Sequence, residues 1–290
     1  MLLLACAAPD VPAGPRVVSL HDTTTEIVVG LGRAADLAAI TEPRFLSDAA
    51  AAAVADVPRL PGGPLSGEGL RALHPTLVLG TDVVDEQTPA LRPQLGAVPV
   101  LFVDPAGLDG LFAAVDQVAA ALDADPAAYR DALAARIPAP ADGPRLRVAL
   151  YDCCDPPFVA GGRVPLTALL DRLGADNVFG RLDQDWAHVS WEALVGARPD
   201  LVVVHDYAWD GQGDTAAKIA ALRDHGVTAP TVVLPLALAL EGPRTLEAPA
   251  VLAPALAAAR ARAGLATPVL PTAGRPLATL PTATLPTAAP

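Results

Sequence analysis

One short pattern occurs once in each half of the chain, and it restricts the folds that the sequence can adopt. The first copy spans residues 66–80 and the second spans residues 190–204. Each copy reads Ser-x-Glu, a short helical stretch, a proline and then an apolar strand, and the two glutamates are Glu68 and Glu192. Serine is a preferred N-cap, and a carboxylate is favoured in the first turn of a helix. The repetition predicts two similar lobes with a ligand cleft between them, and the matched carboxylates predict a partner of two-fold symmetry.

The composition allows a two-domain protein and excludes some partners. The chain has 290 residues, of which 52% are hydrophobic, enough for two domains with a substantial core. Its formal net charge of -12 argues against nucleic acid as a partner, because phosphate recognition needs clustered Lys and Arg. The same charge is typical of an extracellular or periplasmic protein and leaves room for a cationic ligand. No apolar run reaches the length of about 18 residues that a transmembrane helix needs.

Both ends of the chain differ in composition from the rest. Residues 1–6 read Met-Leu-Leu-Leu-Ala-Cys, which resembles the end of a bacterial lipoprotein signal, where cleavage precedes a cysteine that is then lipidated. We therefore expect Cys6 to carry a lipid, and residues 1–15 to be a truncated signal followed by a tether. Residues 266–290 are low in complexity and rich in Pro-Thr-Ala, and we expect them to be disordered.

Between these ends, apolar strands alternate with helical segments. The expected strands are residues 16–20, 37–40, 77–79, 98–103, 147–151, 201–204 and 231–234. Amphipathic spacing predicts a helix at 108–122 and a shorter one from 126 to about 137. An Ala-rich helix is expected at 245–263, interrupted by two prolines. Because alternating strands and helices form βα units, we expect mainly parallel sheets.

Polar and aromatic side chains follow the expected strands. In parallel α/β lobes, ligands bind beyond the C-terminal ends of the strands. On this basis the candidate ligand-binding residues are His21, Asp22, Glu42, Tyr151, Cys153, Cys154, Trp186, His205, Tyr207, Trp209 and Glu241. The same regions also carry Asp82, Asp85, Asp104 and Asp152.

Three interpretations of these residues are open. In the first, aromatic side chains line a pocket for a large metal chelate, which brings its own iron or cobalt, so that the protein needs no intrinsic cofactor. In the second, His21, His205 and Cys153 or Cys154 bind a bare or weakly chelated metal ion directly, since imidazole and thiolate are common metal ligands. In the third, the residues have no ligand: His21 and Asp22 cap a helix, and His205 begins a solvated turn.

The adjacent residues Cys153 and Cys154 are themselves open to more than one state. If Cys6 is lipidated, they remain as an even pair. They can form a vicinal disulfide in an oxidising envelope, stay as thiols that bind a soft metal, or pack as small buried hydrophobes. Neither of the first two states is favoured by the residues around the pair.

The sequence lacks the common signatures of catalysis. It contains no Gly-x-Ser-x-Gly elbow, no P-loop, no Gly-x-Gly-x-x-Gly after a strand and no His-Glu-x-x-His. We therefore expect a binding protein and not an enzyme. The alternative from a different class is a metal-dependent hydrolase with a Cys/His/Asp site.

A set of short segments stands in the order that one protein family has them. These segments are residues 16–20, 25–32, Gly161, Gly174, Asn177, Val178, 189–192, 199–200 and 242–244. In this order they resemble the substrate-binding proteins of the iron-siderophore, heme and vitamin B12 class of ABC importers. The resemblance covers about residues 16–264, most of the chain.

The resemblance implies an α/β fold of two Rossmann-like lobes with mainly parallel sheets, joined by a bridging helix, with the ligand cleft between the lobes. It implies an N-terminal lobe at 16–105, connecting helices at 106–143 and a C-terminal lobe at 144–265, with little hinge motion. The family's bridging helix is typically long, whereas the helix that begins at residue 126 has about a dozen residues, roughly 18 Å. Either the lobes lie closer together than usual, or the helix at 108–122 shares the bridging role.

The resemblance also implies a function. The protein would be the solute-binding component of an ABC importer, capturing a ferric siderophore, a corrinoid or heme and delivering it to a membrane permease dimer and its ATPase. Glu68 and Glu192 would dock onto arginines of the permease. The protein would act as a monomer at the outer face of the cytoplasmic membrane, held only by its lipid anchor. The cleft residues are unusual for an anionic ferric siderophore, which usually meets Arg and Tyr.

Overall fold

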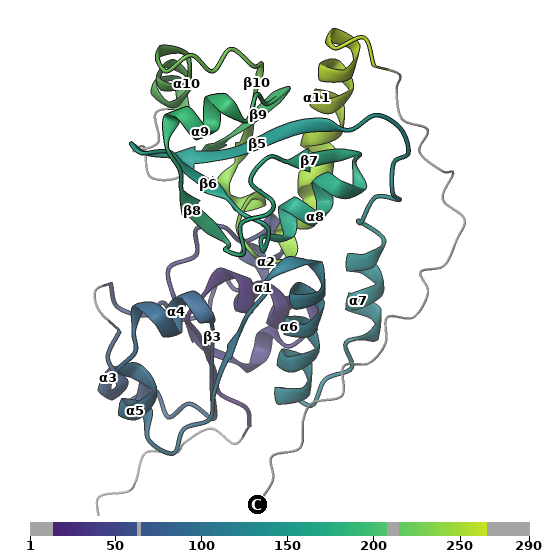
Figure 1. Cartoon of the computed structure of the whole chain (residues 1–290). Helices are drawn as coiled ribbons and strands as arrows, with labels where there is room; N and C mark the ends of the chain where they lie inside the picture. The colour runs from purple at the N-terminus through teal and green to yellow at the C-terminus, as the bar shows by residue number, and fades with distance from the viewer. Residues whose placement is uncertain (1–13, 63–64, 208–214, 266–290) are drawn as a thin grey trace, which may run out of the picture.

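Two lobes, one above the other in Figure 1, make up the fold. The computed structural model describes residues 14–62, 65–207 and 215–265. The N-terminal lobe has a parallel four-stranded sheet of order β2-β1-β3-β4. Its strands are β1 (Val17–Ser19), β2 (Leu37–Ile40), β3 (Leu77–Thr81) and β4 (Val100–Val103). Its helices are α1 (Asp22–Gly30), the 3-10 helix η1 (Ala34–Asp36), α2 (Asp48–Ala53), α3 (Gly67–Arg71), α4 (Asp82–Gln87) and α5 (Leu91–Leu95).

Burial on both faces explains why the strands of this lobe are apolar. Every residue of the central strands β1 and β3 is buried. Because helices cover both faces of such a parallel sheet, its central strands are continuous apolar runs and do not alternate. The four strands expected from the sequence are confirmed, each within a few residues of its expected bounds.

The C-terminal lobe has a mixed six-stranded sheet of order β10-β9-β5-β6-β8, with β7 also paired to β5. Its strands are β5 (Leu146–Cys153), β6 (Phe158–Ala160), β7 (Ala175–Asn177), β8 (Trp186–His188), β9 (Leu201–Asp206) and β10 (Thr231–Pro235). The expected parallel pairing holds for β5, β7, β9 and β10, whereas β6 and β8 are antiparallel. Its helices are α8 (Pro165–Arg172), α9 (Trp191–Gly196), α10 (Thr215–Asp224), η2 (Leu236–Leu238), η3 (Pro243–Glu247) and α11 (Ala248–Arg262).

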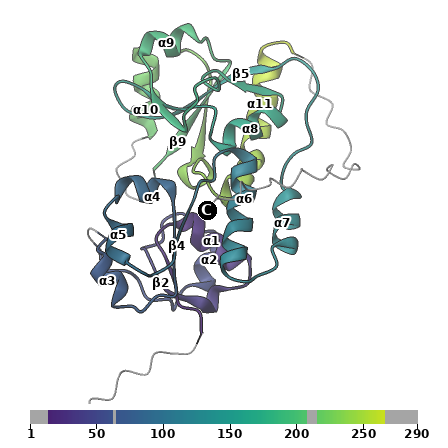
Figure 2. The ribbon, with the colours of Figure 1, turned by 60° about the horizontal axis from the view of Figure 1, so that its bottom comes forward.

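Two helices connect the lobes, and both lie beside the N-terminal lobe in Figures 1 and 2. The amphipathic helix predicted at 108–122 is confirmed as α6 (Gly107–Ala121), which buries one face and packs against α1 and α8. The second helix, α7 (Ala127–Ala134), is shorter than expected. After it, the chain passes to the C-terminal lobe, where the N–H of Ala141 donates to the carbonyl of Arg172 at 2.8 Å. Because α6 touches both lobes, it shares the connecting role with α7.

The last helix differs from the interrupted helix that the sequence predicted. The 3-10 helix η3 comes first, and α11 then runs without a break through Pro254. Buried Leu252 and Leu256 flank the proline, and their packing offsets the one backbone hydrogen bond that it removes. The longest described helices, α6 and α11, have 15 residues each, and no helix in this part of the chain is both long and apolar enough to cross a membrane.

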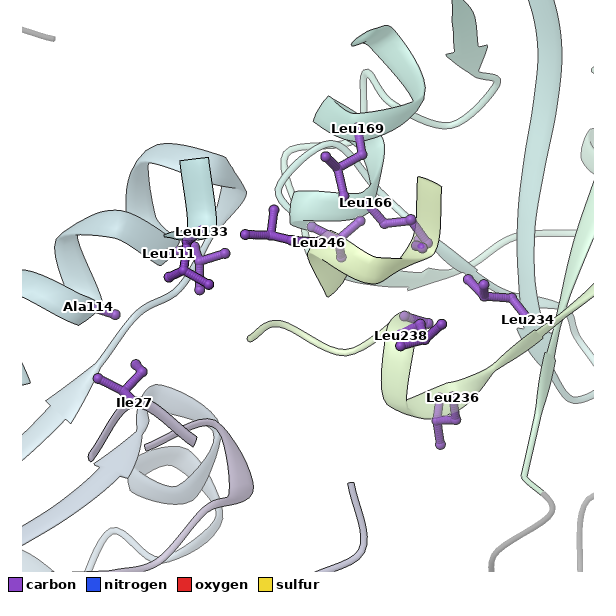
Figure 3. Close-up of a cluster of buried hydrophobic side chains, with 14 of the residues drawn as sticks. Ile27, Leu111, Ala114, Leu133, Leu166, Leu169, Leu234, Leu236, Leu238 and Leu246 are labelled. Carbon is purple, nitrogen blue, oxygen red and sulfur yellow. The ribbon is translucent and has the colours of Figure 1, made fainter. Parts of the chain in front are cut away.

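A single hydrophobic core extends across both lobes (Figure 3). Leu246 of η3 lies between Leu111 and Leu133 of the connecting helices and Leu166 of the C-terminal lobe. Polar contacts flank this junction: the hydroxyl of Thr23 donates to the carbonyl of Glu241 at 2.7 Å, and Arg244 donates to the carbonyls of Phe45 and Leu46 at 3.1 Å. The lobes are therefore joined by a packed interface as well as by the chain.

Leu246→Ala tests whether this shared core makes the lobes fold together. Leu246 is 2% exposed, and its truncation should lower the free energy of unfolding by about 2–5 kcal/mol while leaving one transition. Urea denaturation followed by far-UV circular dichroism, which reports on both lobes, and by tryptophan fluorescence, which reports on the C-terminal half, should give the same midpoint.

The matched control is Val233→Ala, because Val233 is 40% exposed and its truncation should change the free energy of unfolding by less than about 1 kcal/mol. Different midpoints from the two probes in the wild type would show that the lobes unfold separately.

Candidate ligand-binding site

A cavity lies between the two lobes where several strands of both sheets begin or end. The N-terminal lobe contributes residues that follow β1, β3 and β4, and the C-terminal lobe contributes residues around β8 and after η2. The cavity is partly open to solvent and has a volume of about 180 Å³. Its polar and aromatic lining includes His21, Asp82, Asp104, Asp185, Trp186 and Glu241.

His21 stands at the start of α1 and is its N-cap. Its Nδ1 accepts a hydrogen bond from the N–H of Thr23 at 3.2 Å. Burial lowers the pKa of His21, although the neighbouring Asp22 raises it, so the ring is neutral at pH 7. With Nδ1 as the acceptor, the proton of a neutral ring is on Nε2. His21 therefore offers a hydrogen-bond donor, and it could coordinate a metal only by giving up its role as helix cap.

Asp22 and Glu42 are both near His21 but differ in their surroundings. The Oδ2 atom of Asp22 accepts hydrogen bonds from the N–H groups of Arg44 and Phe45, at 2.9 and 2.7 Å. Asp22 therefore orders the loop after β2 and does not cap α1. Glu42 is exposed on this loop and, with His21, lines a neighbouring hollow on the N-terminal lobe.

Asp152, His205 and Tyr207 form a polar network at the ends of β5 and β9. The Nδ1 of His205 lies 3.0 Å from Oδ1 of Asp152, and the hydroxyl of Tyr207 donates to Oδ2. Burial alone would raise the pKa of Asp152, but its bonds to His205 and Tyr207 and the charge of Lys218 hold it below its usual value. His205 is fully buried, so it does not begin a solvated turn, and its ring meets that of Trp186 edge-on at 5.4 Å.

Tyr151, Cys153 and Cys154 do not line the cavity. Tyr151 is 2% exposed and belongs to a separate buried cluster, where its ring lies 6.1 Å from that of Trp191. Cys153, the last residue of β5, forms a vicinal disulfide with Cys154, which begins the following turn. The next residue, Asp155, accepts a hydrogen bond from Nε1 of Trp191 at 3.0 Å, which places the turn beside α9.

The four residues considered for direct metal binding are not brought together. His21 lines the cavity, Cys153 and Cys154 are joined in a disulfide, and His205 pairs with Asp152. No group of three or more His, Cys, Asp or Glu side chains in the described residues could hold a metal ion. Two further predicted residues, Trp209 and Cys6, lie outside the described residues, as do most of the expected tether and the whole of the expected disordered tail.

Asp185 and Arg163 are site residues that the sequence reasoning missed. Asp185 precedes β8, an antiparallel strand of three residues, so its position cannot be found from the ends of parallel strands. Arg163 donates to Asp185 of its own lobe at 3.3 Å and to Asp104 of the other lobe at 2.9 Å. This contact joins the lobes at the rim of the cavity. The acidic run Asp183 to Asp185 directly before Trp186 was the signal available in the sequence.

Glu241 is the cavity residue with the most altered acidity. The indole Nε1 of Trp186 donates to its Oε1 at 2.7 Å. Burial, together with the charges of Asp185 and Asp82, raises the pKa of Glu241 to about 7, against the hydrogen bonds to its carboxylate. Glu241 is therefore partly protonated at neutral pH, and it can both donate and accept hydrogen bonds in the cavity.

The two Ser-x-Glu segments have the same local structure. Each begins with a serine N-cap, Ser66 for α3 and Ser190 for α9, whose hydroxyl accepts from the backbone N–H three residues on at 3.1 Å. Glu68 and Glu192 are exposed in the first turns. Figures 1 and 2 show α3 and α9 in different lobes but on the same side of α6. The predicted equivalence of the two acidic helix starts is confirmed.

An arginine supports the far end of each of these helices. The guanidinium of Arg16, directly before β1, donates to the carbonyl of Leu73 at 2.7 Å. That of Arg147 in β5 donates to the carbonyl of Ala197, also at 2.7 Å. Leu73 and Ala197 each stand two residues before the proline of their segment. Each acidic helix is therefore capped at its start by a serine and fixed at its end to the central strand of its lobe.

Comparisons with known proteins agree with this architecture. The profile of a family described as "Periplasmic binding protein" matches residues 17–225. A periplasmic binding protein from Veillonella parvula is 26% identical in a match that covers 84% of this chain and 91% of that chain, with a TM-score of 0.71. The comparison with curated proteins gave no significant match.

Two further solved structures carry ligand names. The periplasmic heme-binding protein BhuT in complex with two hemes is 26% identical, and the match covers 84% of this chain and 98% of that chain with a TM-score of 0.62. The vitamin B12 binding protein BtuF of Vibrio cholerae is 18% identical, with 84% and 97% covered and a TM-score of 0.58, a likeness of fold alone. These proteins are named as binding proteins and not as enzymes.

Glu241→Gln tests the protonation of the cavity. Between pH 4.5 and about 7 the folded protein keeps a proton on Glu241 that the unfolded chain has lost, so the stability from this group falls as the pH rises through that window. The variant should be more stable than the wild type above pH 7, by on the order of 1–3 kcal/mol, and the difference should vanish toward pH 4.5. Thermal unfolding over this pH range measures the effect.

The control is Glu42→Gln, which removes the same formal charge at an exposed position near the cavity. Parallel pH curves for Glu241→Gln and the wild type would show that Glu241 is ionised in the cavity like an ordinary glutamate.

Proposed function

Because the chain belongs to the periplasmic binding protein family, we propose that it is the extracytoplasmic solute-binding component of an ABC importer. It captures a metal chelate between its lobes and delivers it to a membrane permease dimer with its ATPase. The chelate is a ferric siderophore, a corrinoid or heme, so that iron or cobalt arrives with the ligand. The protein needs no intrinsic cofactor for this role.

The observation that carries the proposal is the matched pair of acidic helix starts. A single carboxylate in a first turn would be explained by the helix dipole, which accounts for about 0.3–1 kcal/mol. The two acidic helix starts lie one on each lobe, and both have a serine cap, an exposed glutamate and a supporting arginine. Such a matched pair is suited to a partner of two-fold symmetry. A carboxylate can meet an arginine through two charge-assisted hydrogen bonds, and two such contacts fix an orientation.

A chelate is favoured over a bare metal ion by the cavity. It lies between the two lobes, and the indole of Trp186 gives it an aromatic wall. The described residues provide no set of three side chains that could hold a metal ion directly. The heme and vitamin B12 in the names of the similar structures support the same class of ligand.

The permease contact is tested by the double variant Glu68→Ala/Glu192→Ala. Both side chains are exposed and neither lines the cavity between the lobes, so the variant should bind its ligand with wild-type affinity. Uptake of radioactive metal by cells that carry the permease should fall by about tenfold or more, because a tenfold change needs only 1.4 kcal/mol of lost docking free energy.

The matched control is Asp48→Ala/Asp109→Ala, which removes two exposed carboxylates from the first turns of other helices, α2 and α6. It should transport normally. Loss of ligand affinity in the Glu68/Glu192 variant, or equal uptake by both double variants, would overturn the assignment of the two glutamates to docking.

Membrane anchoring follows from Cys6, which we propose is the lipidated residue that holds a monomeric protein at the outer face of the cytoplasmic membrane. In cells that express the full precursor, Cys6→Ser should move the protein from the membrane fraction to the soluble fraction. The matched control is Cys154→Ser, which removes a cysteine that lies in a disulfide and not in the expected lipid attachment sequence. A Cys6→Ser protein that still sediments with membranes would contradict the anchor.

A further inference from the structure

The cavity between the lobes is acidic on both sides. Asp82 and Asp104 line it from the N-terminal lobe, and Asp185 and Glu241 line it from the C-terminal lobe. Among the described residues that line it there is no Lys or Arg. The cation that touches this group is Arg163 at the rim, and it already pairs with both Asp104 and Asp185.

The two other carboxyl groups therefore lack a compensating positive charge among the described residues. Burial raises the pKa of Asp82, and the charge of Asp104 raises it further. The pKa of Glu241 is raised by burial and by the charges of Asp185 and Asp82. His21, which lines the same cavity, has its pKa lowered by burial and contributes no positive charge at pH 7. The cavity thus has a negative potential at the place where a ligand would sit.

A second and independent feature marks the same cavity. Thr81 lines it and is 2% exposed, and its Oγ1 has no hydrogen-bond partner among the described residues. Thr81 is also the N-cap of α4, yet its side chain makes no capping bond. Buried hydroxyl groups are normally paired, so an unpaired one beside a cavity is available to a polar group of a ligand.

We propose that this cavity selects metal chelates whose facing surface is cationic or uncharged, and that it discriminates against chelates that present a carboxylate to Asp82 and Glu241. The inference rests on the proposed function, and it narrows the ligand class. A ligand ammonium or amide N–H can donate to these carboxyl groups and to the hydroxyl of Thr81. A ligand carboxylate would face like charges in a partly closed cavity, where screening by water and salt is weak.

Pairs of chelates that differ only in the charge of one peripheral group test the proposal. The three chelate types are ferric trihydroxamates, cobalt corrinoids and iron porphyrins, each prepared with one peripheral group as an amide and as a carboxylate. The trihydroxamate is also prepared with a free amine. Affinities of the whole protein are measured by isothermal titration calorimetry at low salt. In the class that binds, the amide form should bind at least about tenfold more tightly than the carboxylate form, the amount expected for one close charge pair near a surface.

Asp82→Asn identifies the charge responsible. It should reduce the amide-to-carboxylate preference by at least about threefold, because Asp82 has no cationic partner that would be left unpaired. The matched control is Asp85→Asn in the same helix, which removes the same single negative charge from the protein. Asp85 pairs with Arg92 at 2.9 Å and does not line the cavity, so this variant should keep the wild-type preference.

The outcomes separate the inference from the proposed function. Equal binding within each pair, tighter binding of the carboxylate form, or the same effect from Asp82→Asn and Asp85→Asn would overturn the charge selection and leave a chelate-binding protein. Absence of binding in all three chelate classes would overturn both. If the wild type keeps its preference for the amide form at high salt, the charges are shielded from solvent, as the proposal requires. If the wild type shows no preference at low salt, the proposal is wrong.

Discussion

The apolar contact between the lobes is the interaction on which the rest of the structure depends. Leu246 and its neighbours form one core with side chains of α6, α7 and α8. Because this core includes side chains of both lobes, the lobes cannot separate without exposing it to water, at a cost of roughly 25 cal/mol per Å² of apolar surface. The hydrogen bonds of Thr23 and Arg244 lie beside it and fix the position of the N-terminal lobe against η3. The core and these hydrogen bonds therefore resist changes in the separation of the two lobes, between which the cavity lies.

That arrangement explains why the cavity can carry so many carboxyl groups. Repulsion between Asp82, Asp104, Asp185 and Glu241 would drive the lobes apart if the lobes were free to move. The shared core resists this repulsion, and Arg163 offsets part of it by pairing with one carboxylate from each lobe. On our proposal, a ligand that is cationic or uncharged on its facing surface would reduce the repulsion that remains. The shared core thus stabilises an arrangement of carboxyl groups that by itself disfavours the folded state.

The fold could be predicted from the sequence to a greater extent than the site. Continuous apolar runs such as 201–204 and the strong periodicity of 108–122 arise from burial, which leaves a clear pattern over several residues. The antiparallel pair β6 and β8 has three residues in each strand, too few for any period, and it was missed. Asp185 was missed as a site residue for the same reason, because it directly precedes β8. His21 and Glu241 were found because they follow regular elements, whereas Tyr151 at the same kind of position packs into the core, because the side chains of a strand point to alternate faces.

The internal repeat extends further than its sequence signature. Arg16 and Arg147 are hydrogen-bonded to equivalent carbonyls, and the residue before each proline, His74 or Arg198, has a positive φ, 48° and 45°. A left-handed conformation at a residue other than glycine is costly, so its occurrence at the same place in both lobes indicates a common constraint. The constraint is the sharp turn that takes the chain from the acidic helix into the strand beside β1 or β5. Because that strand belongs to the sheet, the turn fixes the exposed carboxylate relative to the centre of its lobe. The shared core then fixes the two lobes relative to each other, and the distance between the two carboxylates becomes a property of the whole fold.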